Sequence, residues 1–522
     1  VSFVDQSGNE IPSGTPLFLG AEWGDVLPFS LQEAERQRID REGITRTVYH
    51  DPGPPCFIDQ NDSMSTKHYQ WGFALVSKWS SHLDPSDQVM WDISPRSMGN
   101  LSLEAFPKDI ESLPEFYRTE GGQPAAGYAT NPATNQPYQE QMVYRGDYTR
   151  VLAEFWADGP DSETPPGHWF TLLNYVSDHP QHEHKFRGEG PLLTQLEWDV
   201  KSYFMLGGAM HDAAISAWSI KGYYDYIRPI SAIRYLAAQG QSSDPALPRY
   251  SPQGIRLDSG YVALVEPNDP LAGEQGEHVG KIKLFAWKGH REIQDASEDQ
   301  AGVGWILAEE WWPYQRPNFV TPPFAGYVSG HSTFSRAAAE VLTQLTGDEY
   351  FPGGMGEFVA KRDNFLVFEK GPSTDVVLQW ATYYDASDQC SLSRIWGGIH
   401  PPVDDIPGRL IGAKVGRQAF DFARKYFDSK VVLSTRAPSA KSELAVYPNP
   451  ATPGHEIAVE APPGEYRGTV VRSDGNTLLQ TTLTVSSQGR TSLTLPLAPA
   501  GVYLLRLQKD QFNQSVRLIV SQ

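Results

Sequence analysis

The spacing of apolar residues changes after Lys430, and this change divides the chain into two parts of different fold class. Before it, apolar residues recur at helical spacing over long stretches, which predicts a mainly α domain over residues 1–430. After it, short alternating runs separated by turns are typical of a small all-β sandwich, expected over residues 444–522. A polar, Pro-containing linker over residues 431–443 is expected to join them.

The mainly α part is expected to combine helices with extended connections, because the chain contains 46 Gly and 41 Pro. Helices are expected over residues 30–41 (with Ser30 as the cap), 148–156, 193–228, 332–345, 376–386 and 408–427. A turn-dense loop is expected over 158–169, and two short strands near 261–266 and 281–287. In the β part, strands are expected at 457–461, 468–472, 477–485, 491–497, 501–508 and 515–520.

The net charge of −20 argues against nucleic acid or an anionic membrane as a partner, since acidic surfaces repel phosphate groups. Against that background, any cluster of cations is noteworthy. No run approaches the roughly 20 apolar residues that span a bilayer, so no membrane span is expected. The chain begins at Val1 with neither Met nor an apolar leader, so we expect the numbering to start after a removed signal and the protein to be exported.

The two cysteines, Cys56 and Cys390, are far apart in the sequence. Export permits a disulfide between them, but their separation in space is left open by the sequence. The alternatives are buried thiols or, for Cys390, a reactive role close to Ser393. No Cys/His zinc spacing is present.

The stretch Ser393–Asp404 holds a fixed cation, an imidazole and a carboxylate close together. Arg394 offers a planar fork of donors suited to an oxyanion, and His400 can present one ring nitrogen as a ligand or nucleophile while a partner holds the other. Asp404 lies four residues after His400, so it shares the same face if the prolines at 401 and 402 start a helix. The alternative interpretation is a loop with an ordinary surface ion pair.

Two further stretches offer donors to an anion. Lys221 and Arg228 are seven residues apart, so they share a helix face about 10 Å apart along the axis and could converge on one ligand. Ser329-Gly330-His331 precedes an Ala-rich helix, whose free N–H groups and positive dipole end favour an anion. The alternatives are cations that face water and a helix cap with an incidental histidine.

Taken together, Lys-x6-Arg-Pro, Ser-Gly-His and Ser-Arg-x5-His-x3-Asp occur in the order and spacing of one motif set. The chain resembles the superfamily of vanadium-dependent haloperoxidases and type 2 phosphatidic acid phosphatases from the Glu22-Trp23-Gly24 region to about residue 425. One departure is Val328, where the family usually has Pro before Ser-Gly-His; it removes no donor. The resemblance implies a helical-bundle, vanadium haloperoxidase-like catalytic domain.

The resemblance also implies a role for each matching residue. His400 would be the single protein ligand of vanadium, with Asp404 orienting its ring. Bound vanadate would be neutralised by Lys221, Arg228 and Arg394 and would accept hydrogen bonds from Ser329 and Gly330. His331 would take a proton from hydrogen peroxide, and Lys221 would polarise bound peroxide for attack by halide.

The motifs alone do not separate halide oxidation from phosphate ester hydrolysis, because vanadate and phosphate share shape and charge. In the phosphatases of this superfamily the equivalent of His400 is a nucleophile that forms phosphohistidine. Trp218 and Phe324 match aromatic residues that flank the halide in fungal chloroperoxidases, and a dry aromatic wall suits a weakly hydrated halide. The prediction is therefore a haloperoxidase acting on chloride or bromide with vanadate as cofactor, hydrogen peroxide as co-substrate and a small organic acceptor. Alternatives are a secreted acid phosphatase, a non-catalytic surface protein that binds an anion, and, for the two aromatics, plain core residues.

The last 80 or so residues contain Tyr447-Pro448-Asn449-Pro450 and Leu497-Ala498-Pro499-Ala500-Gly501-Val502-Tyr503. They resemble the C-terminal sorting domain of bacterial type IX secretion cargo. This resemblance implies a secreted or cell-surface protein that binds the secretion machinery through this domain. An adhesive or carbohydrate-binding module is the alternative.

Overall fold

The computed structural model describes residues 3–4, 10–11, 20, 22–41, 43–158, 162–428, 444–472, 476–509 and 512–521. These residues form two compact units, Val1–Asp428 and Ser429–Gln522. The linker predicted over residues 431–443 lies outside the described residues. The two units are described separately below.

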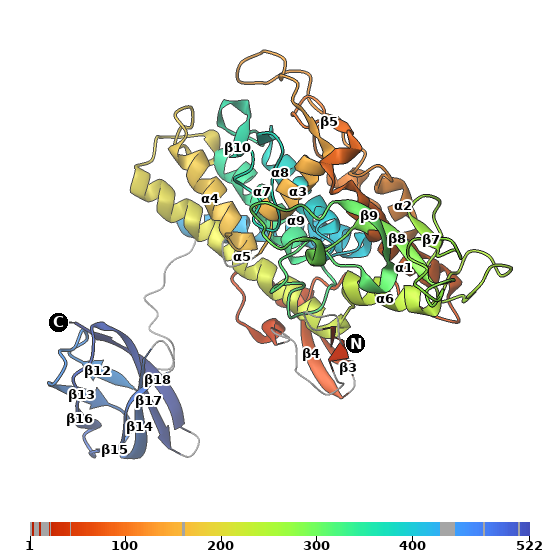
Figure 1. The fold of residues 1–522 in the computed structure, drawn as a ribbon. Helices are drawn as coiled ribbons and strands as arrows, with labels where there is room; N and C mark the ends of the chain where they lie inside the picture. Colours follow the sequence, from red (N-terminus) through yellow and green to blue (C-terminus); the bar gives the residue numbers. More distant parts are fainter. Residues whose placement is uncertain are drawn as a thin grey trace. The chain divides into compact units, whose positions relative to one another are not determined.

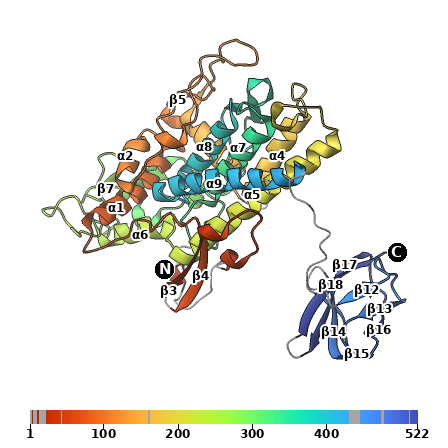
Figure 2. The same ribbon diagram turned by 180° about the vertical axis from the view of Figure 1, so that it is seen from behind.

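The centre of the first unit is a bundle of four long helices, which both views show side by side (Figures 1 and 2). They are α5 (Gln195–Tyr224), α7 (Gly330–Thr346), α8 (Tyr383–Trp396) and α9 (Pro402–Phe427). Helix α7 packs against each of the other three, so the bundle is organised around it. The four helices confirm the mainly α prediction for this part of the chain.

Other helices and small sheets surround this bundle. The remaining α-helices are α1 (Ser63–Trp79), α2 (Leu113–Phe116), α3 (Arg145–Phe155), α4 (Pro165–Asp178) and α6 (Pro229–Gln239). Antiparallel pairs are β1 (Phe3–Val4) with β2 (Glu10–Ile11), β3 (Arg36–Arg41) with β4 (Ile44–Tyr49), β5 (Met90–Asp92) with β6 (Met142–Tyr144), and β10 (Gly356–Ala360) with β11 (Val376–Trp380). A three-stranded sheet has the order β7 (Val262–Leu264), β8 (Ile282–Trp287), β9 (Val303–Leu307).

Local sequence explains where the long helices begin and end. The Thr194 side chain accepts a hydrogen bond from Glu197 N and caps α5, which ends at Asp225 in the left-handed conformation. Helix α9 starts directly after Pro401, with Pro402 in its first turn, where a missing N–H costs little. Among the described residues, no helix is long and apolar enough to cross a bilayer.

Helices α7 and α9 lie unusually close because three glycines of α9 face α7. A Cβ on Gly408 would lie 2.8 Å from the Ser329 carbonyl oxygen, and one on Gly412 would lie 2.4 Å from that of Thr333. A Cβ on Gly416 would lie 2.5 Å from the carbonyl oxygen of Ala337. Real Cβ atoms do not approach an oxygen so closely, so the backbones touch only because side chains are absent here.

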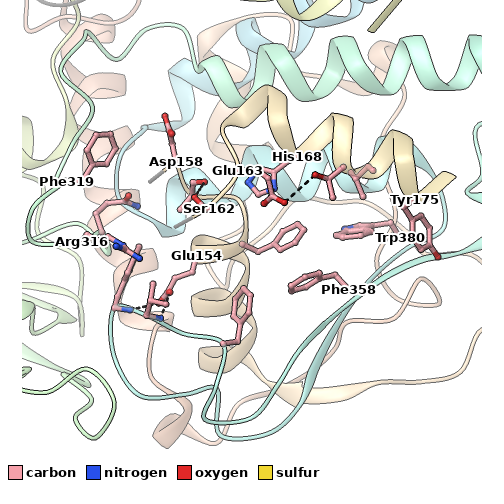
Figure 3. Close-up of a pocket in the computed structure, with 18 of the residues that line it drawn as sticks. Glu154, Asp158, Ser162, Glu163, His168, Tyr175, Arg316, Phe319, Phe358 and Trp380 are labelled. Carbon is pink, nitrogen blue, oxygen red and sulfur yellow. Dashed lines mark hydrogen bonds and ion pairs between the residues drawn. The ribbon is translucent and has the colours of Figure 1, made fainter. Parts of the chain in front are cut away.

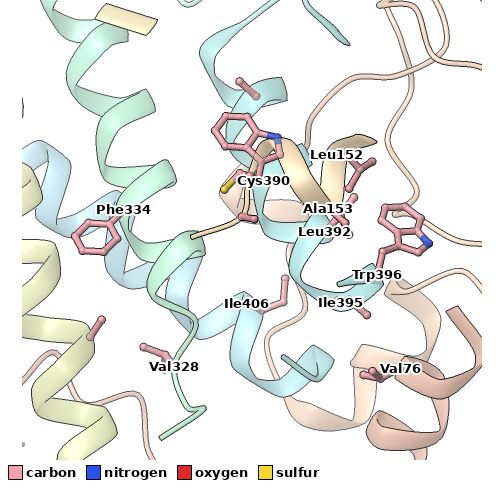
Figure 4. Packing of buried hydrophobic residues seen from close by; sticks show 14 of the residues in the cluster. Val76, Leu152, Ala153, Val328, Phe334, Cys390, Leu392, Ile395, Trp396 and Ile406 are labelled. Atoms are coloured by element: carbon pink, nitrogen blue, oxygen red, sulfur yellow. The ribbon is translucent and has the colours of Figure 1, made fainter. Parts of the chain in front are cut away.

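A cavity of about 360 Å³ lies between the end of α3, the start of α4 and the β10–β11 hairpin (Figure 3). The first unit also has one large apolar core. Its centre includes Phe334 of α7, Ile395 of α8, Ile406 of α9 and Val76 of α1 (Figure 4). The core therefore joins the bundle to the helices around it.

Three of the expected elements in this unit are wrong. Residues 30–41 form a short 3₁₀ turn and strand β3 instead of a helix, because Ser30 donates from its N and Oγ to Asp212 (2.7 and 2.6 Å) and caps nothing. Residues 376–386 are split into strand β11 and the start of α8, since Thr382 and Asp385 form a capping box. Within the predicted loop 158–169, α4 already begins at Pro165.

The second unit is an all-β sandwich, as predicted. One sheet has the order β12 (Ala445–Tyr447), β13 (Glu456–Glu460), β16 (Arg490–Thr494), and the other β15 (Thr477–Val485), β14 (Gly464–Arg472), β17 (Gly501–Lys509), β18 (Phe512–Val520). All pairings between these named strands are antiparallel, and the buried residues of both sheets form one core. Strand β12 was not predicted from the sequence.

Candidate functional site

The ends of the helices in the first unit bring the three motif stretches together. Lys221 lies in the last turn of α5, and Arg228 is the residue before α6. Ser329 precedes α7. The third stretch runs from the last turn of α8, which contains Arg394, into the first turn of α9, which contains Asp404. Direct contacts join them: Arg228 donates to His400, and Ser329 N donates to the carbonyl oxygen of Asp404 (2.8 Å).

His400 and Asp404 form a buried pair that fixes the imidazole. The distance from His400 Nδ1 to Asp404 Oδ2 is 2.6 Å, and the side chains are 3% and 0% exposed. Burial, followed by the nearby cations Arg228 and Lys221, holds the pKa of His400 well below its usual range. Burial raises the pKa of Asp404 to about 8, against the opposing effect of Lys221 and Arg228. The imidazole is therefore neutral. Because the Arg228 guanidinium 3.1 Å from His400 Nε2 can only donate, Nε2 has the lone pair and the ring proton lies on Nδ1, which donates to Asp404 Oδ2.

That lone pair points at a cation. Nη1 of Arg228 lies 3.1 Å from His400 Nε2 and also donates to the Ile399 carbonyl oxygen at 2.9 Å. An anion that entered here would meet both the imidazole lone pair and the guanidinium N–H groups. The arrangement suits an oxyanion centre whose central atom needs a nitrogen ligand.

Three cations are buried around His400. Lys221 Nζ donates to the carbonyl oxygens of Ala325 (3.0 Å) and Gly326 (2.7 Å), which leaves its third N–H for a ligand. Burial, with Arg228 adding to it, holds the pKa of Lys221 well below its usual value, and burial lowers the pKa of Arg228 to about 10. Burial also lowers the pKa of Arg394 to about 10. Concentrated positive charge at this depth is costly and is relieved by a bound anion.

Two buried nitrogen atoms at this place have no hydrogen-bond partner among the described residues. They are Nη1 of Arg394 and Nε2 of His331. Arg394 is otherwise held by Ser393 Oγ (3.0 Å) and by the carbonyl oxygen of Ala153 (2.7 Å), so its remaining nitrogen is aimed by fixed contacts. Buried polar atoms without partners are rare in folded proteins and indicate a missing ligand or water.

His331 lies in the first turn of α7 and is buried. Burial and the nearby Arg394 hold its pKa well below the usual range, so its ring is neutral and can accept a proton. A bound anion would offset the charge of Arg394 and raise this pKa, because opposite charge favours the protonated form. The position and electrostatics of His331 suit an acid/base group beside the cationic cluster.

Ser329 and Gly330 lie at the helix N-terminus that faces this cluster. The Ser329 hydroxyl is the cap of α7: it accepts from Ser332 N (3.3 Å) and contacts Ser332 Oγ (3.0 Å), which itself donates to Asp405 (2.8 Å). Donation from Ser329 to an anion would therefore require its proton to turn away from Ser332. Gly330 occupies the first turn, where backbone N–H groups have no partner within the helix.

The two predicted pocket aromatics are in contact beside Lys221. The ring centroids of Trp218 and Phe324 are 4.9 Å apart, and Lys221 Nζ lies 5.7 and 5.5 Å from them. A Cβ on Gly330 would come within 3.0 Å of the Trp218 ring, so glycine lets the indole lie against the turn. These rings form an apolar wall next to the ammonium group.

Several neighbours of this site were not identified from the sequence. Phe334 and Trp23 add further rings to Trp218, with centroid distances of 5.7 and 6.3 Å. Phe334 could have been found from its position four residues after Gly330, one helical turn along α7. The charge of Asp158 opposes the lowering of the Arg394 pKa by burial, and no spacing in the sequence signals this.

The cysteines take no part in this arrangement. Cys56 and Cys390 are both free and buried, so the disulfide that the sequence left open is not formed. Burial raises the pKa of each thiol to about 12, which keeps both protonated and unreactive.

The donor set fits an oxyanion and does not fit a bare metal cation. Among the described residues, no group of three or more His, Cys, Asp or Glu side chains could hold a metal ion. The cluster instead combines one neutral imidazole with three cations and a helix N-terminus, which suits vanadate or phosphate.

Comparisons with known proteins match two parts of the chain. Residues 201–429 match the family model described as the VCPO second helical-bundle domain, and residues 445–521 match the Secretion system C-terminal sorting domain. Every site residue predicted from the sequence lies within residues 201–429. Comparison with curated proteins gives no match.

Solved structures similar to this chain include an apo-type and a holo-type bacterial vanadium-dependent chloroperoxidase and a bacterial vanadium-dependent iodoperoxidase. Their sequence identities to this chain are 17%, 18% and 20%, with TM-scores of 0.38, 0.36 and 0.29. The matches cover 55%, 54% and 52% of this chain, and 46%, 44% and 43% of those chains. This chain therefore spans less than half the length of these relatives, and likeness at this level carries no argument about the site.

Proposed function

With residues 201–429 forming a domain of the vanadium haloperoxidase superfamily, as the motifs predicted, we propose that the chain binds vanadate and oxidises halide with hydrogen peroxide to hypohalous acid. The observation that carries the proposal is the cluster of Lys221, Arg228 and Arg394 around a neutral imidazole whose Nδ1 is held by Asp404. Such a cluster favours a highly charged oxyanion and leaves His400 Nε2 as its nitrogen ligand.

Each residue then has a definite task. His400 would hold vanadate through Nε2, while Lys221, Arg228 and Arg394 neutralise its oxygens, with Ser329 and Gly330 as added donors. Vanadate, when bound, supplies the Lewis acid centre at which peroxide becomes reactive toward halide. His331 accepts a proton from hydrogen peroxide at Nε2. Trp218 and Phe324 bound the space for a weakly hydrated halide beside the Lys221 ammonium.

Phosphate ester hydrolysis is the second candidate, since the same cluster suits phosphate. His400 Nε2 would then attack phosphorus, and His331 would protonate the leaving group. The lone pair on a neutral, oriented His400 favours this candidate as much as the first. The contact between Lys221 and the aromatic pair is what favours halide oxidation.

One preparation under two assays tests the proposal. We expect peroxide-dependent bromination of a cyclic dione that requires added orthovanadate, and little hydrolysis of nitrophenyl phosphate. Hydrolysis that vanadate only inhibits, with no halide oxidation, would contradict it and favour the phosphatase. Anion binding without either activity would also contradict it and favour a non-catalytic surface protein.

We expect the Phe324→His variant to change the preference between chloride and bromide. The imidazole would replace an apolar ring whose centroid lies 5.5 Å from Lys221 Nζ. Its polar nitrogens would bring water into the space for the halide. The measurement is the ratio of kcat/KM for the two halides in each protein. The Phe106→His variant serves as the control, because Phe106 is a buried ring that packs against Arg336 and Arg409 instead. An unchanged halide ratio in Phe324→His would show that Phe324 is a core residue only.

The second unit indicates the cellular location of the protein. A secretion-system sorting domain over residues 445–521 indicates a secreted or cell-surface protein whose partner is that machinery.

A further inference from the structure

The cavity of about 360 Å³ beside α3 has a wall of aromatic rings (Figure 3). The ring of Phe155 lies 4.5 Å from that of Phe358 and 5.8 Å from that of Trp380, measured between centroids. Phe365 extends the wall beyond Phe358 at 5.5 Å. The volume falls in the range of small-molecule sites, about 300–1,000 Å³, and rings of this kind pack well against a planar guest.

The aromatic wall adjoins a polar group, His168, whose ring centroid lies 5.3 Å from that of Phe155. His168 lines the cavity and is 3% exposed, with Nδ1 3.5 Å from Glu163 Oε2. Its Nε2 is buried and has no hydrogen-bond partner among the described residues. Because Nδ1–H faces the carboxylate, Nε2 presents a lone pair that suits a hydroxyl donor. Burial, opposed by Glu163 and the Ala157 carbonyl, lowers the pKa of His168, so its ring is a neutral acceptor.

The cavity shares a wall with the cationic cluster. Ala153 O accepts a hydrogen bond from Arg394 at 2.7 Å, while the next two residues along α3, Glu154 and Phe155, line the cavity. Asp158 lines the cavity, and its charge opposes the lowering of the Arg394 pKa by burial. His168 adds to the lowering of the His331 pKa that burial and Arg394 cause. Less than one turn of α3 therefore separates Ala153, which holds Arg394, from the residues that line the cavity.

We propose that this cavity binds an aromatic alcohol, with its ring against Phe155, Phe358 and Trp380 and its hydroxyl donating to His168 Nε2. The bound molecule is the organic acceptor of the proposed halide oxidation, on which the inference rests. A neutral guest fits because the lining carboxylates Asp158, Glu163 and Glu357 outnumber the lining guanidinium of Arg316, which disfavours a phenolate or carboxylate. Electron-rich phenols are also the rings that an electrophilic halogen attacks most readily.

The chemistry requires only hypohalous acid as oxidant. A ring carbon ortho or para to the hydroxyl bonds to the halogen, and the halogen–oxygen bond breaks. The hydroxide that leaves combines with the displaced ring proton, so phenol and hypohalous acid give halophenol and water. His168 Nε2 orients the phenol through the phenol hydroxyl. A ring held near the cationic cluster would be halogenated before the hypohalous acid diffuses away.

A binding titration without vanadate tests the site independently of turnover. We expect calorimetry to show saturable, one-site binding of 2-phenylphenol to the full chain and at least about tenfold weaker binding of the saturated analogue 2-cyclohexylcyclohexanol. Val367 lines the cavity and is 51% exposed, so Val367→Trp would fill its mouth without disturbing the core. Val359 of the neighbouring β10 is 43% exposed and does not line it, and Val359→Trp is the matched control.

We expect Val367→Trp to weaken 2-phenylphenol binding by about tenfold or more and Val359→Trp to change it less than about twofold. Absence of saturable binding, or equal affinity of both variants, would overturn the proposal. A second readout is the ratio of para to ortho bromination of 2-phenylphenol during turnover. We expect this ratio to differ from that of hypobromite in buffer and to return to the buffer value in Val367→Trp. If no hypobromite forms, the proposed function fails while the titration still decides the binding site.

Discussion

The His400→Ala variant is expected to lose vanadate binding and to lower kcat/KM for halide oxidation by about 10³-fold or more, which corresponds to about 4 kcal/mol. The reason is geometric: Nε2 is the imidazole nitrogen that Asp404 leaves with a lone pair, 3.1 Å from the Arg228 guanidinium. Alanine removes that nitrogen and leaves the cations in place. Vanadate affinity is measured by calorimetric titration and turnover by dione bromination.

The loss must be separated from a loss of folding. In His400→Ala, Asp404 loses its 2.6 Å partner, which is expected to cost about 1–3 kcal/mol of stability. His82→Asn is the control, because His82 is also buried and hydrogen-bonded, accepting from Trp396 Nε1 at 3.2 Å, but lies outside the cluster. We expect this control to bind vanadate with unchanged affinity. Unchanged activity in His400→Ala would refute the assignment of His400.

The second large effect is expected from a single methyl group between α7 and α9. In Gly412→Ala the new Cβ would lie 2.4 Å from the Thr333 carbonyl oxygen, a backbone atom that cannot move without shifting α7. Overpacking of this kind costs about 1–3 kcal/mol or more. Because Ser329 N donates to Asp404 O across the same contact, separation of the helices also pulls the two halves of the site apart.

A matched glycine distinguishes packing from helix propensity. Gly207 lies within α5, and the nearest atom to a Cβ there is in the Phe170 ring at 3.9 Å. We expect Gly207→Ala to be neutral or to stabilise by about 0.4–1 kcal/mol. Urea unfolding and vanadate titration of both variants give the comparison. A Gly412→Ala protein as stable as the parent would show that the close approach of α7 and α9 is not required.

The sequence predicted the helices in which apolar residues recur at helical spacing over many turns and whose ends carry a cap or a proline. Residues 193–228 and 408–427 correspond to α5 and α9, and the prolines at 401 and 402 marked the start of α9. The predicted helix at 376–386 failed because Val376-Val377-Leu378 is short enough to fit either period, and the pairing with β10 decided for a strand. Tertiary contacts outweighed the local preference there.

For the candidate site, the sequence predicted which residues would come together but not how they are held. Spacing along one helix placed Asp404 beside His400, and the pair is in contact. The cap at Ser329, in contrast, depends on Ser332 and Asp405, and their meeting follows from the packing of α9 on α7. Asp158 and Trp23 reach the site through loops and turns, which carry no periodic signal.

The most direct test of the central claim is a crystal structure of the protein grown with orthovanadate, with vanadium located by its anomalous scattering. We expect one vanadium atom within bonding distance of His400 Nε2, with its oxygens accepting hydrogen bonds from Lys221, Arg228 and Arg394. Nδ1 of His400 would keep its contact with Asp404. Vanadium bound elsewhere, or an empty cluster at saturating orthovanadate, would contradict the proposed function at its foundation.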